Sequence, residues 1–461
     1  MDVGNTGPQG DGGTSGPESL SRRTVLRAAG LTAAGLGAGL VMSGCGSPAA
    51  AGLFGGSLDP GVVTFWNLFG GGDGVRLQTM LDAYKAAHGA NSLTASTFAW
   101  GDPYYTKVTL ATVGGKAPNV AVSHLTRMQN LAAADLLTPI TDDMLSSVGL
   151  SASDFNQNAW KNQQRDGKNY AIPLDTHPIV LFYNVDVCQK AGLLASDGTL
   201  KPLEGVAQWE AALTAAQKTT GAYALGIANV SEYATPWRLF QTLYSQMDGS
   251  TPFLGDNGKT LTVNDPLALK ALDYIGRMSS QGWIPKTADY GGAETLMFTG
   301  KAAFFIQGEW ELTTAQAVTG LKFGMAPIPQ LFDKKAVQAD SHTFVLPKLD
   351  RTPEQLKRDM GFVKFMLEQS MTWAQGGHIP AYLPTLDSAE YKALRPQADY
   401  SSVADYTVFD ALAWYSGSGS SFENIVGSNI GLVQQGLSTS AQALASIRTQ
   451  LNPYLNAANP L

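Results

Sequence analysis

Strand-like and helix-like patterns alternate along the first part of the chain. A β-branched and aromatic run at residues 62–66 predicts a buried strand, and apolar residues across 76–88 then recur at the three-to-four-residue spacing of one helix face. A second strand-like run at 93–98 and a helical pattern at 104–113 lead to a third strand-like run at 119–122. Because consecutive strands separated by helices pair in parallel, this order predicts an α/β fold with a mostly parallel sheet.

The middle of the chain has two extended runs and then mostly helical patterns. The runs at residues 170–173 and 179–184 are separated by a short segment punctuated with proline, which favours a strand that leaves one lobe and enters another. The serine- and glycine-rich residues 416–421 predict a short flexible loop. Helical patterns are predicted at 206–218, 236–247, 266–281, 353–369 and 403–415.

The N-terminus predicts an export signal. Arg22 and Arg23 precede an apolar stretch at residues 28–42, which is too short and too rich in glycine for a stable membrane span. The paired arginines look like a twin-arginine signal. We therefore expect residues 1–44 to be a signal peptide.

Cys45 follows this stretch directly and predicts a lipid anchor. Residues 42–45, Met-Ser-Gly-Cys, resemble a bacterial lipobox, in which the cysteine thiol takes a diacylglycerol. The alternative is a secreted protein in which the cysteine is incidental. Residues 45–58 are small and neutral, which is typical of a flexible tether, so the folded part is expected from about residue 59.

Composition narrows the class of protein. The chain has 461 residues, of which 44% are hydrophobic and 15% charged, enough for two packed cores. The formal charge of −7 disfavours binding to nucleic acid. With Cys45 lipidated, the second of the two cysteines, Cys188, has no disulfide partner and is expected to be a buried free thiol.

Short motifs between residues 60 and 385 carry a family resemblance. They are VTFW at 63–66, GGKAPNV at 114–120, GKNYAIP at 167–173, LFYN at 181–184, MFTGKAAFFIQGEW at 297–310, GMAPIP at 324–329 and GGHIP at 376–380. In order and spacing they resemble those of family 1 extracellular solute-binding proteins, the group that includes maltose-binding proteins.

The resemblance implies a periplasmic-binding-protein fold of type II, with two α/β lobes joined by crossover hinge segments around a ligand cleft. It assigns residues 59–175 and about 322–380 to lobe 1, and residues 176–321 and about 381–461 to lobe 2. It also implies a monomeric substrate-binding component of an ABC importer. Such a protein closes on a carbohydrate, delivers it to a membrane permease, uses no cofactor and catalyses no reaction.

Candidate ligand contacts follow from sugar chemistry, which calls for aromatic rings to stack on and polar side chains for hydroxyl groups. Trp310 is the strongest candidate for ligand contact, because the resemblance places a stacking aromatic residue at this position. The alternative is that Trp310 belongs to the hydrophobic core. Glu309 serves either the ligand or a helix N-terminus. The remaining candidates lie in predicted loops or in the crossing segment: Trp66, Asn67, Asp73, Trp100, Tyr104, His124, Asp175, His177, Tyr233, Trp237, His378 and Tyr382.

Several of these assignments have alternatives. Trp66 is equally a core residue, and Asp175 with His177 equally forms a hydrogen-bonded pair at the hinge. The glycine loop at residues 70–72 leaves a phosphorylated or glycerophosphodiester ligand open, because backbone N–H groups at a helix start bind anions. A glycoside hydrolase would need two carboxylates across a bond, for which Asp175 and Glu309 are the available pair.

Other enzymatic motifs are weak. Residues 258–260 resemble the end of a Walker loop, but Phe253 stands where its first glycine is required, so a hairpin turn is expected. The five histidines lack the i, i+4 spacing of helical zinc sites, and no metal site is expected. No catalytic residue is assigned.

Overall fold

The computed structural model describes residues 61–458. The predicted signal peptide (1–44), the lipidation site Cys45 and the tether (45–58) lie outside the described residues. Within residues 61–458, no helix combines the length and the apolar character needed to span a membrane.

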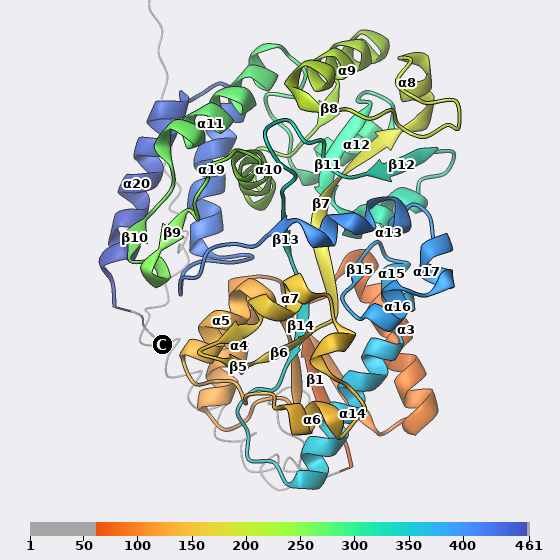
Figure 1. Cartoon of the computed structure of the whole chain (residues 1–461), viewed down its shortest axis with the longest axis vertical. Coiled ribbons are helices and arrows are strands. Elements are labelled where there is room, and N and C mark those ends of the chain that lie inside the picture. The colour runs from red at the N-terminus through yellow and green to blue at the C-terminus, as the bar shows by residue number, and fades with distance from the viewer. Residues whose placement is uncertain (1–60, 459–461) are drawn as a thin grey trace, which may run out of the picture. The chain divides into compact units, whose positions relative to one another are not determined.

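Buried apolar side chains form two separate clusters, and each defines a lobe. The first cluster takes its members from residues 63–174 and 344–382. The second takes them from residues 179–337 and 379–451. We call the elements around these clusters lobe 1 and lobe 2; they are the lower and upper groups of elements in Figure 1.

Lobe 1 is built on a five-stranded sheet in the order β2-β1-β3-β14-β6. The first three strands pair in parallel, as the alternating pattern predicted, and β14 pairs antiparallel with both β3 and β6. The strands are β1 (Val63–Asn67), β2 (Leu93–Thr97), β3 (Val120–His124), β6 (Ala171–Pro173) and β14 (His342–Val345). The helices of this part are α3 (Gly71–His88), α4 (Asp102–Val113), α5 (Leu125–Ala133), α6 (Asp142–Ser146), α7 (Gln157–Asn162), α14 (Pro353–Glu368), α15 (Ser370–Ala374) and α16 (Leu383–Leu386).

Lobe 2 is built around one long strand, β7 (Asp175–Asn184), whose ten residues are all buried. In contrast to the parallel pairing expected, β11, β12, β13 and β15 all pair with β7 antiparallel. The other strands of this sheet are β8 (Leu225–Gly226), β11 (Phe304–Gly308), β12 (Phe323–Ala326), β13 (Val337–Asp340), β15 (Ile379–Pro380) and β16 (Thr407–Val408).

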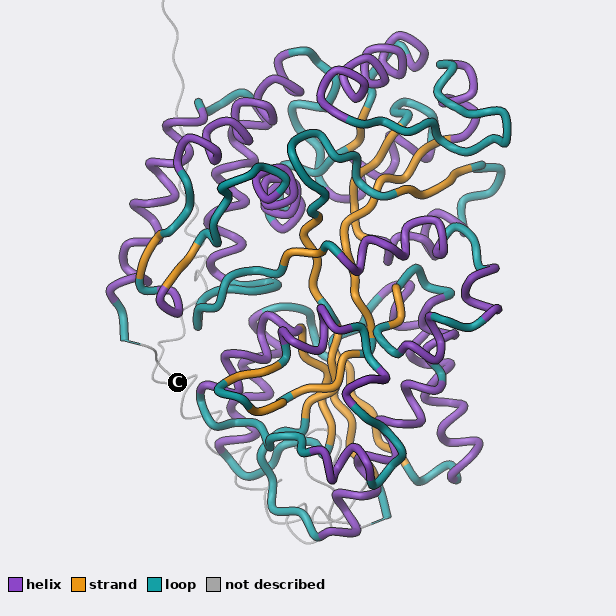
Figure 2. The backbone as a smooth tube through the Cα atoms, in the orientation of Figure 1, coloured by secondary structure: helices purple, strands orange, loops and turns teal. Residues whose placement is uncertain are grey.

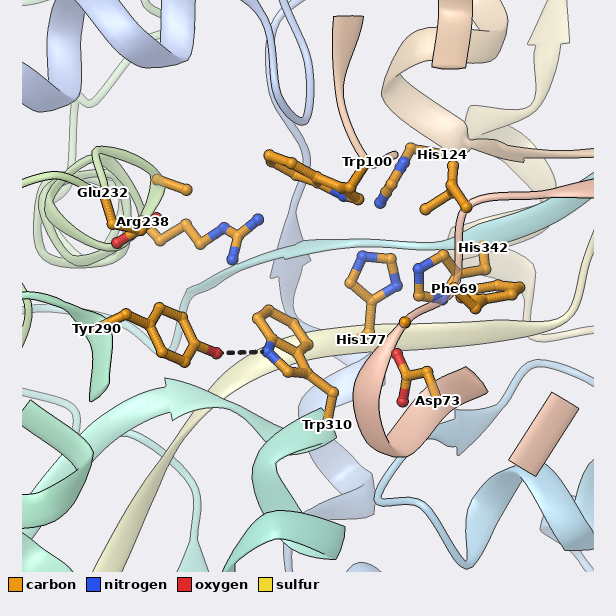
Figure 3. Close-up of a pocket in the computed structure, with 13 residues that line it drawn as sticks. Phe69, Asp73, Trp100, His124, His177, Glu232, Arg238, Tyr290, Trp310 and His342 are labelled. Carbon is orange, nitrogen blue, oxygen red and sulfur yellow. Dashed lines mark hydrogen bonds between the residues drawn. The ribbon is translucent and has the colours of Figure 1, made fainter. Parts of the chain in front are cut away.

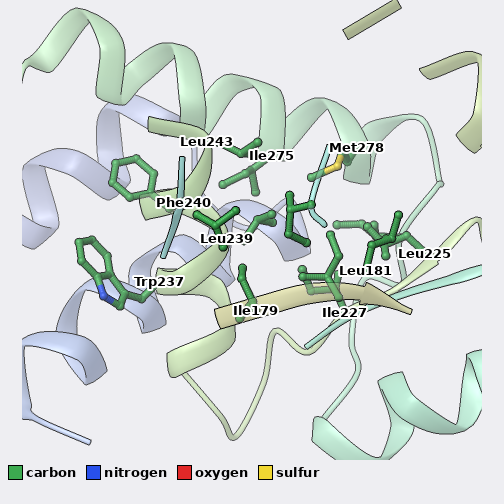
Figure 4. Packing of buried hydrophobic residues seen from close by; sticks show 14 of the residues in the cluster. Ile179, Leu181, Leu225, Ile227, Trp237, Leu239, Phe240, Leu243, Ile275 and Met278 are labelled. Carbon is green, nitrogen blue, oxygen red and sulfur yellow. The ribbon is translucent and has the colours of Figure 1, made fainter. Parts of the chain in front are cut away.

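Helices cover the lobe 2 sheet. Trp237, Phe240 and Leu243 of α10 pack over β7 together with Ile275 of α11 (Figure 4). The predicted helices correspond to α9 (Gly205–Thr220), α10 (Ala234–Ser245), α11 (Asp265–Ser280) and, in lobe 1, α14. The sequence patterns did not predict α8 (Val185–Lys190), α12 (Tyr290–Phe298), α13 (Leu312–Gln316), α17 (Ala389–Ala393), α18 (Gln397–Tyr400), α19 (Ser421–Gln435) and α20 (Ser440–Asn456).

The chain crosses between the lobes three times, and the first two crossing segments meet. The chain leaves β6 of the lobe 1 sheet and enters β7 directly, and it returns from β13 to β14 (Figure 2). At the crossing, His177 is paired with Asp340, and the backbone N–H of Leu174 donates to the carbonyl of His342. The crossing strand predicted at residues 170–184 is therefore confirmed.

Three expectations differ from the structure. Residues 322–340, assigned to lobe 1, pack in the lobe 2 cluster, because β12 and β13 pair with β7. Residues 403–415 are not one helix, because pairing of β16 with β13 holds part of them extended. Residues 416–421 are not an exposed flexible loop, since Ser416, Ser418 and Ser420 are buried.

Two smaller expectations are confirmed. The short strands β9 (Leu254–Gly255) and β10 (Thr260–Leu261) pair antiparallel, so residues 256–259 form the predicted hairpin turn. A second such pair is β4 (Gln164–Arg165) with β5 (Lys168–Asn169). Cys188 on α8 is a buried free thiol, and burial raises its pKa to about 12.

Candidate ligand-binding cleft

A cavity of about 330 Å³ lies between the two lobes, at the crossing segments. This volume falls within the range of small-molecule sites. Lobe 1 lines it with residues that follow β1 and β2, with the last residue of β3 and with the first residue of β14. Lobe 2 lines it mainly from α10, α12 and the turn after β11 (Figure 3). The lining residues are Leu68, Phe69, Gly70, Asp73, Trp100, His124, His177, Glu232, Ala234, Arg238, Tyr290, Trp310 and His342.

The lobe 2 wall is aromatic, and its central residue is Trp310. Trp310 lies in a short 3-10 turn, Glu309–Glu311, that follows β11. Its indole Nε1 donates to the Tyr290 hydroxyl at 2.9 Å, and that hydroxyl donates in turn to the Glu311 carboxylate. The guanidinium of Arg238 lies 5.0 Å from the indole centroid. These contacts hold the indole in one orientation at the edge of the cavity.

Arg238 is the one cationic side chain among the lining residues, and burial raises the pKa of the neighbouring Glu423 to about 8. The Nε of Arg238 lies 3.6 Å from Oε1 of Glu423, which is buried on α19. The other carboxylate oxygen of Glu423 accepts from the backbone N–H of Gly419. Two carboxylates, Asp73 and Glu232, also line the cavity, so its wall carries no excess of positive charge.

The lobe 1 wall and the crossing strand present three imidazoles. His124 ends β3, His177 lies on β7 and His342 begins β14. The ring centroids of His177 and His342 are 4.0 Å apart and stacked, and His124 lies 5.0 Å from His342. Burial lowers the pKa of His177 to about 3 and the pKa of His124 well below its ordinary value, so both imidazoles are neutral at pH 7.

Asp175, behind the imidazoles, holds two of them in place. Its carboxylate accepts from Nδ1 of His342 at 2.8 Å and lies 3.2 Å from Nδ1 of His177. It also accepts from the His342 backbone N–H at 2.7 Å and from the Trp373 indole at 2.6 Å. Burial favours the neutral acid, but these donors outweigh it and hold the pKa of Asp175 well below its usual range. An ionised carboxylate therefore fixes both rings.

His378 forms a second layer with three carboxylates. Its Nε2 lies 2.9 Å from Asp73, and its Nδ1 lies 3.0 Å from Glu309 and 3.2 Å from Asp175. Burial opposes the charged imidazole, but these neighbours, Asp73 foremost, raise the pKa of His378 well above its ordinary value. Burial raises the pKa of Glu309 to about 7. This layer lies behind the cavity wall and joins lobe 1 to the turn that carries Trp310.

The structure brings five of the predicted contacts to the cavity and places three more directly behind it. The five lining residues are Asp73, Trp100, His124, His177 and Trp310. The three behind the wall are Asp175, Glu309 and His378, each with no exposed surface.

The other six candidates do not line the cavity. Trp66 packs in the lobe 1 core against Phe98, and Tyr233 is partly exposed before α10. The polar groups of the remaining four are used inside the lobes. Asn67 accepts from Phe69 N–H, Tyr104 donates to the Val122 carbonyl, Trp237 donates to Asp410, and Tyr382 pairs with Lys364.

Sequence reasoning missed seven lining residues, among them one of the three imidazoles, and considered Gly70 only as part of an anion-binding loop. His342 follows Asp340 and Ser341 in a buried segment between two strands, and this run of polar residues resembles Asp175–His177 in the first crossing. That signal was available in the sequence, but only strand pairing shows that the two runs meet. The missed residues are Leu68, Phe69, Glu232, Ala234, Arg238, Tyr290 and His342.

Comparison with known proteins identifies the family. Residues 71–371 match the model of the bacterial extracellular solute-binding protein family. The chain belongs to this family. The two-lobed solute-binding fold inferred from the sequence motifs is thereby confirmed, and the family is one of exported proteins.

Curated solute-binding relatives are distant. Maltodextrin-binding protein MdxE of Bacillus subtilis is 25% identical over 252 residues, 52% of this chain and 55% of the relative, so the match spans about half of that protein. An arabinooligosaccharide-binding protein of Bacillus subtilis is 25% identical over 382 residues, 78% of this chain and 82% of the relative.

Solved structures of solute-binding proteins share the fold. UgpB from Mycobacterium tuberculosis, in complex with glycerophosphocholine, matches with a TM-score of 0.69 at 18% identity, over 87% of this chain and 99% of that one. The GacH receptor of Streptomyces glaucescens, solved unliganded and with acarbose, matches with a TM-score of 0.68 at 19% identity, over 85% and 99%. At these identities the likeness concerns the fold alone.

Proposed function

We propose that this solute-binding protein captures a carbohydrate, most simply an oligosaccharide, in the cleft and delivers it to the permease of an ABC importer. The observation that carries the proposal is the orientation of Trp310. Its indole, held by Tyr290, faces a cavity whose opposite side offers neutral imidazole nitrogens. An aromatic face opposite polar edges suits a sugar, which has an apolar ring face and a rim of hydroxyl groups.

Ligand capture follows from the two-lobe construction. A carbohydrate that touches Trp310 of lobe 2 and His124 of lobe 1 makes its full set of contacts only when the lobes are close. Such a ligand stabilises the closed arrangement by its differential contacts, which is the general requirement for ligand-driven closure. The two relatives whose printed names specify maltodextrin and arabinooligosaccharide binding support this ligand class.

The cellular setting belongs to the same proposal. Residues 1–44 direct twin-arginine export, diacylglycerol on Cys45 anchors the protein to the outer face of the membrane, and residues 45–58 tether the folded part. The protein acts as a monomer, without a catalytic residue.

A phosphorylated or glycerophosphodiester ligand is the alternative that the glycine loop left open. The N-terminus of α3 does line the cavity at Gly70, but Asp73 places a carboxylate in its first turn. Glu232 adds a second carboxylate to the lining, on the same side as Arg238. Both features disfavour an anion. The glycosidase pair is likewise unsupported, because Asp175 and Glu309 lie behind the cavity wall.

The test is a thermal-shift screen of the protein without its signal peptide and Cys45, from residue 46 onward, against monosaccharides, oligosaccharides, sugar phosphates and glycerophosphodiesters. A ligand that binds only the folded state increases the free energy of unfolding, and therefore raises Tm. At a ligand concentration one hundred times Kd, the increase is about 2.7 kcal/mol. We expect an oligosaccharide series to raise Tm, and the stabilisation at the same ligand concentration to fall to about a third in Trp310→Ala. A shift with phosphorylated ligands alone would contradict the carbohydrate proposal.

A further inference from the structure

Three histidines of the cleft together form the donor set of a transition-metal site. His124, His177 and His342 each offer one ring nitrogen, and the three nitrogens lie within 4.8 Å of one another. They come from three different strands, so no sequence spacing announces them. All three side chains are buried and all three line the cavity.

The hydrogen bonds of the rings show which nitrogens are available. Nδ1 of His177 and Nδ1 of His342 both face the Asp175 carboxylate, which only accepts, so in each ring Nε2 is the nitrogen left to bind an ion. Nδ1 of His124 lies 2.7 Å from the Tyr105 hydroxyl. Within residues 61–458, none of the three Nε2 atoms has a hydrogen-bond partner.

This arrangement matches the outer layer of known metal sites. Histidine ligands generally bind the ion through one nitrogen and donate the other N–H to a carboxylate or another acceptor, which fixes the ring and raises its basicity. Asp175 serves two rings in this way, and the Tyr105 hydroxyl contacts Nδ1 of the third, His124.

We propose that His124, His177 and His342 bind a divalent transition-metal ion of the Zn²⁺ class through their Nε2 atoms, with an open coordination position that faces the cavity. Three imidazoles with one open position are a known zinc arrangement, and imidazole donors favour Zn²⁺, Cu²⁺ and Ni²⁺ over Mg²⁺ and Ca²⁺. Metal–nitrogen bonds of about 2.0–2.1 Å separate tetrahedral donors by about 3.4 Å. The three donor nitrogens must therefore approach one another, and the stacked rings of His177 and His342 must turn toward the ion.

The open position gives the ion a role in ligand recognition. The His177 ring lies 5.8 Å from the Trp310 ring, so one ligand can coordinate the ion through an oxygen and stack on the indole. This role rests on the proposed function, whereas binding of the ion does not. The ligand class that it favours is a polyol or sugar with adjacent hydroxyl groups.

The experiment starts from protein freed of metal with a chelator. We expect Zn²⁺ to bind at one equivalent in calorimetry, and Co²⁺ to give the intense visible bands of a low-coordinate site with nitrogen ligands. His124→Gln, His177→Gln and His342→Gln should each weaken Zn²⁺ binding by at least about tenfold. The matched control is His88→Gln, because His88 is exposed at the end of α3 and should leave binding unchanged.

The outcomes separate the two proposals. Absence of Zn²⁺ heat and of the Co²⁺ spectrum at submillimolar metal overturns the metal site, and so does Zn²⁺ binding that is weakened by His88→Gln but not by the cleft variants. The Co²⁺ spectrum of the unaltered protein remains decisive if a cleft variant fails to fold. A carbohydrate-induced Tm shift without metal binding overturns the metal site alone, and metal binding without any carbohydrate shift overturns the proposed function alone.

Discussion

The two walls of the cleft are built in different ways. On the lobe 1 side, His124 and His342 lie at the ends of sheet strands, and buried partners fix their rings. On the lobe 2 side, Trp310 and Tyr290 lie on a short turn and at the start of a helix, and they are held chiefly by each other. The first wall is therefore tied to the stability of the fold, and the second has more freedom to determine which ligand fits.

Replacing Asp175 should have the largest effect on stability, because this one carboxylate holds several groups of the first wall in place. In Asp175→Ala, the Trp373 indole, the His342 backbone N–H and the Nδ1 groups of two histidines lose a buried acceptor. Removing one partner of a buried charged network costs about 3–5 kcal/mol. We expect a loss of this size in the free energy of unfolding measured with urea. A loss below about 1 kcal/mol would show that water replaces the carboxylate.

Trp310→Ala should have the opposite profile. Truncation of a central interface tryptophan typically costs about 2 kcal/mol or more, so carbohydrate affinity should fall by about 30-fold while Tm in the absence of ligand changes little. Calorimetric titration measures the affinity, and a thermal melt without ligand measures the Tm. Trp100→Ala is the matched control, because Trp100 lines the cavity from lobe 1. If Trp100→Ala weakens binding more than Trp310→Ala, the assignment of ligand stacking to lobe 2 is wrong.

A third substitution tests the contact between the lobes at residues 416–420, and its expected effect on ligand affinity is smaller than that of Trp310→Ala. Ser418 N–H donates to Thr126 Oγ1 at 3.2 Å, and Ser418 Oγ donates to Asp340 at 2.7 Å, so this lobe 2 segment is bound to lobe 1 and to the crossing. A Cβ on Gly417 would lie 2.7 Å from Thr126 Oγ1. Gly417→Ala should therefore disfavour the close arrangement, lower ligand affinity by a few-fold and increase the radius of gyration in solution scattering.

Gly436→Ala separates steric overlap from backbone strain. Both glycines have positive φ, +96° at Gly417 and +73° at Gly436, but an added Cβ on Gly436 meets nothing within 4 Å. Placing alanine at either position forces a residue with a Cβ into a left-handed backbone conformation, which lowers the free energy of unfolding by about 1–2 kcal/mol. If both variants change affinity and scattering equally, backbone strain and not the contact between lobes is the cause.

The same contrast explains which features the sequence could predict. Trp310 and the family motifs are local, and they led to the fold, the crossing strand and the aromatic wall. His342 and its two neighbouring imidazoles are brought together only by pairing of β14 with β3 and by the crossing at β7, which no spacing along the chain records. Residues 416–421 were mistaken for a flexible loop because small residues also allow two lobes to approach closely, as Gly417 and Gly419 do.

The smallest expected effect is the pH dependence of thiol labelling at Cys188. Labelling of this residue measures the unfolding of lobe 2 separately from that of lobe 1. The thiol is buried in the lobe 2 cluster, and burial raises its pKa to about 12. A thiol reacts as the thiolate, so labelling of the native protein should be slow and should increase little between pH 7 and pH 9, whereas an unfolded cysteine, with a pKa of about 8.5, reacts faster across that range. The pKa is raised in the folded state, so this thiol favours folding fully below the unfolded pKa and progressively less as pH rises toward 12.

In Asp175→Ala, Cys188 should stay protected at urea concentrations that already expose the tryptophans of lobe 1. Simultaneous exposure of both would show that the two lobes unfold as one unit, and that the wall anchored by Asp175 supports lobe 2 as well.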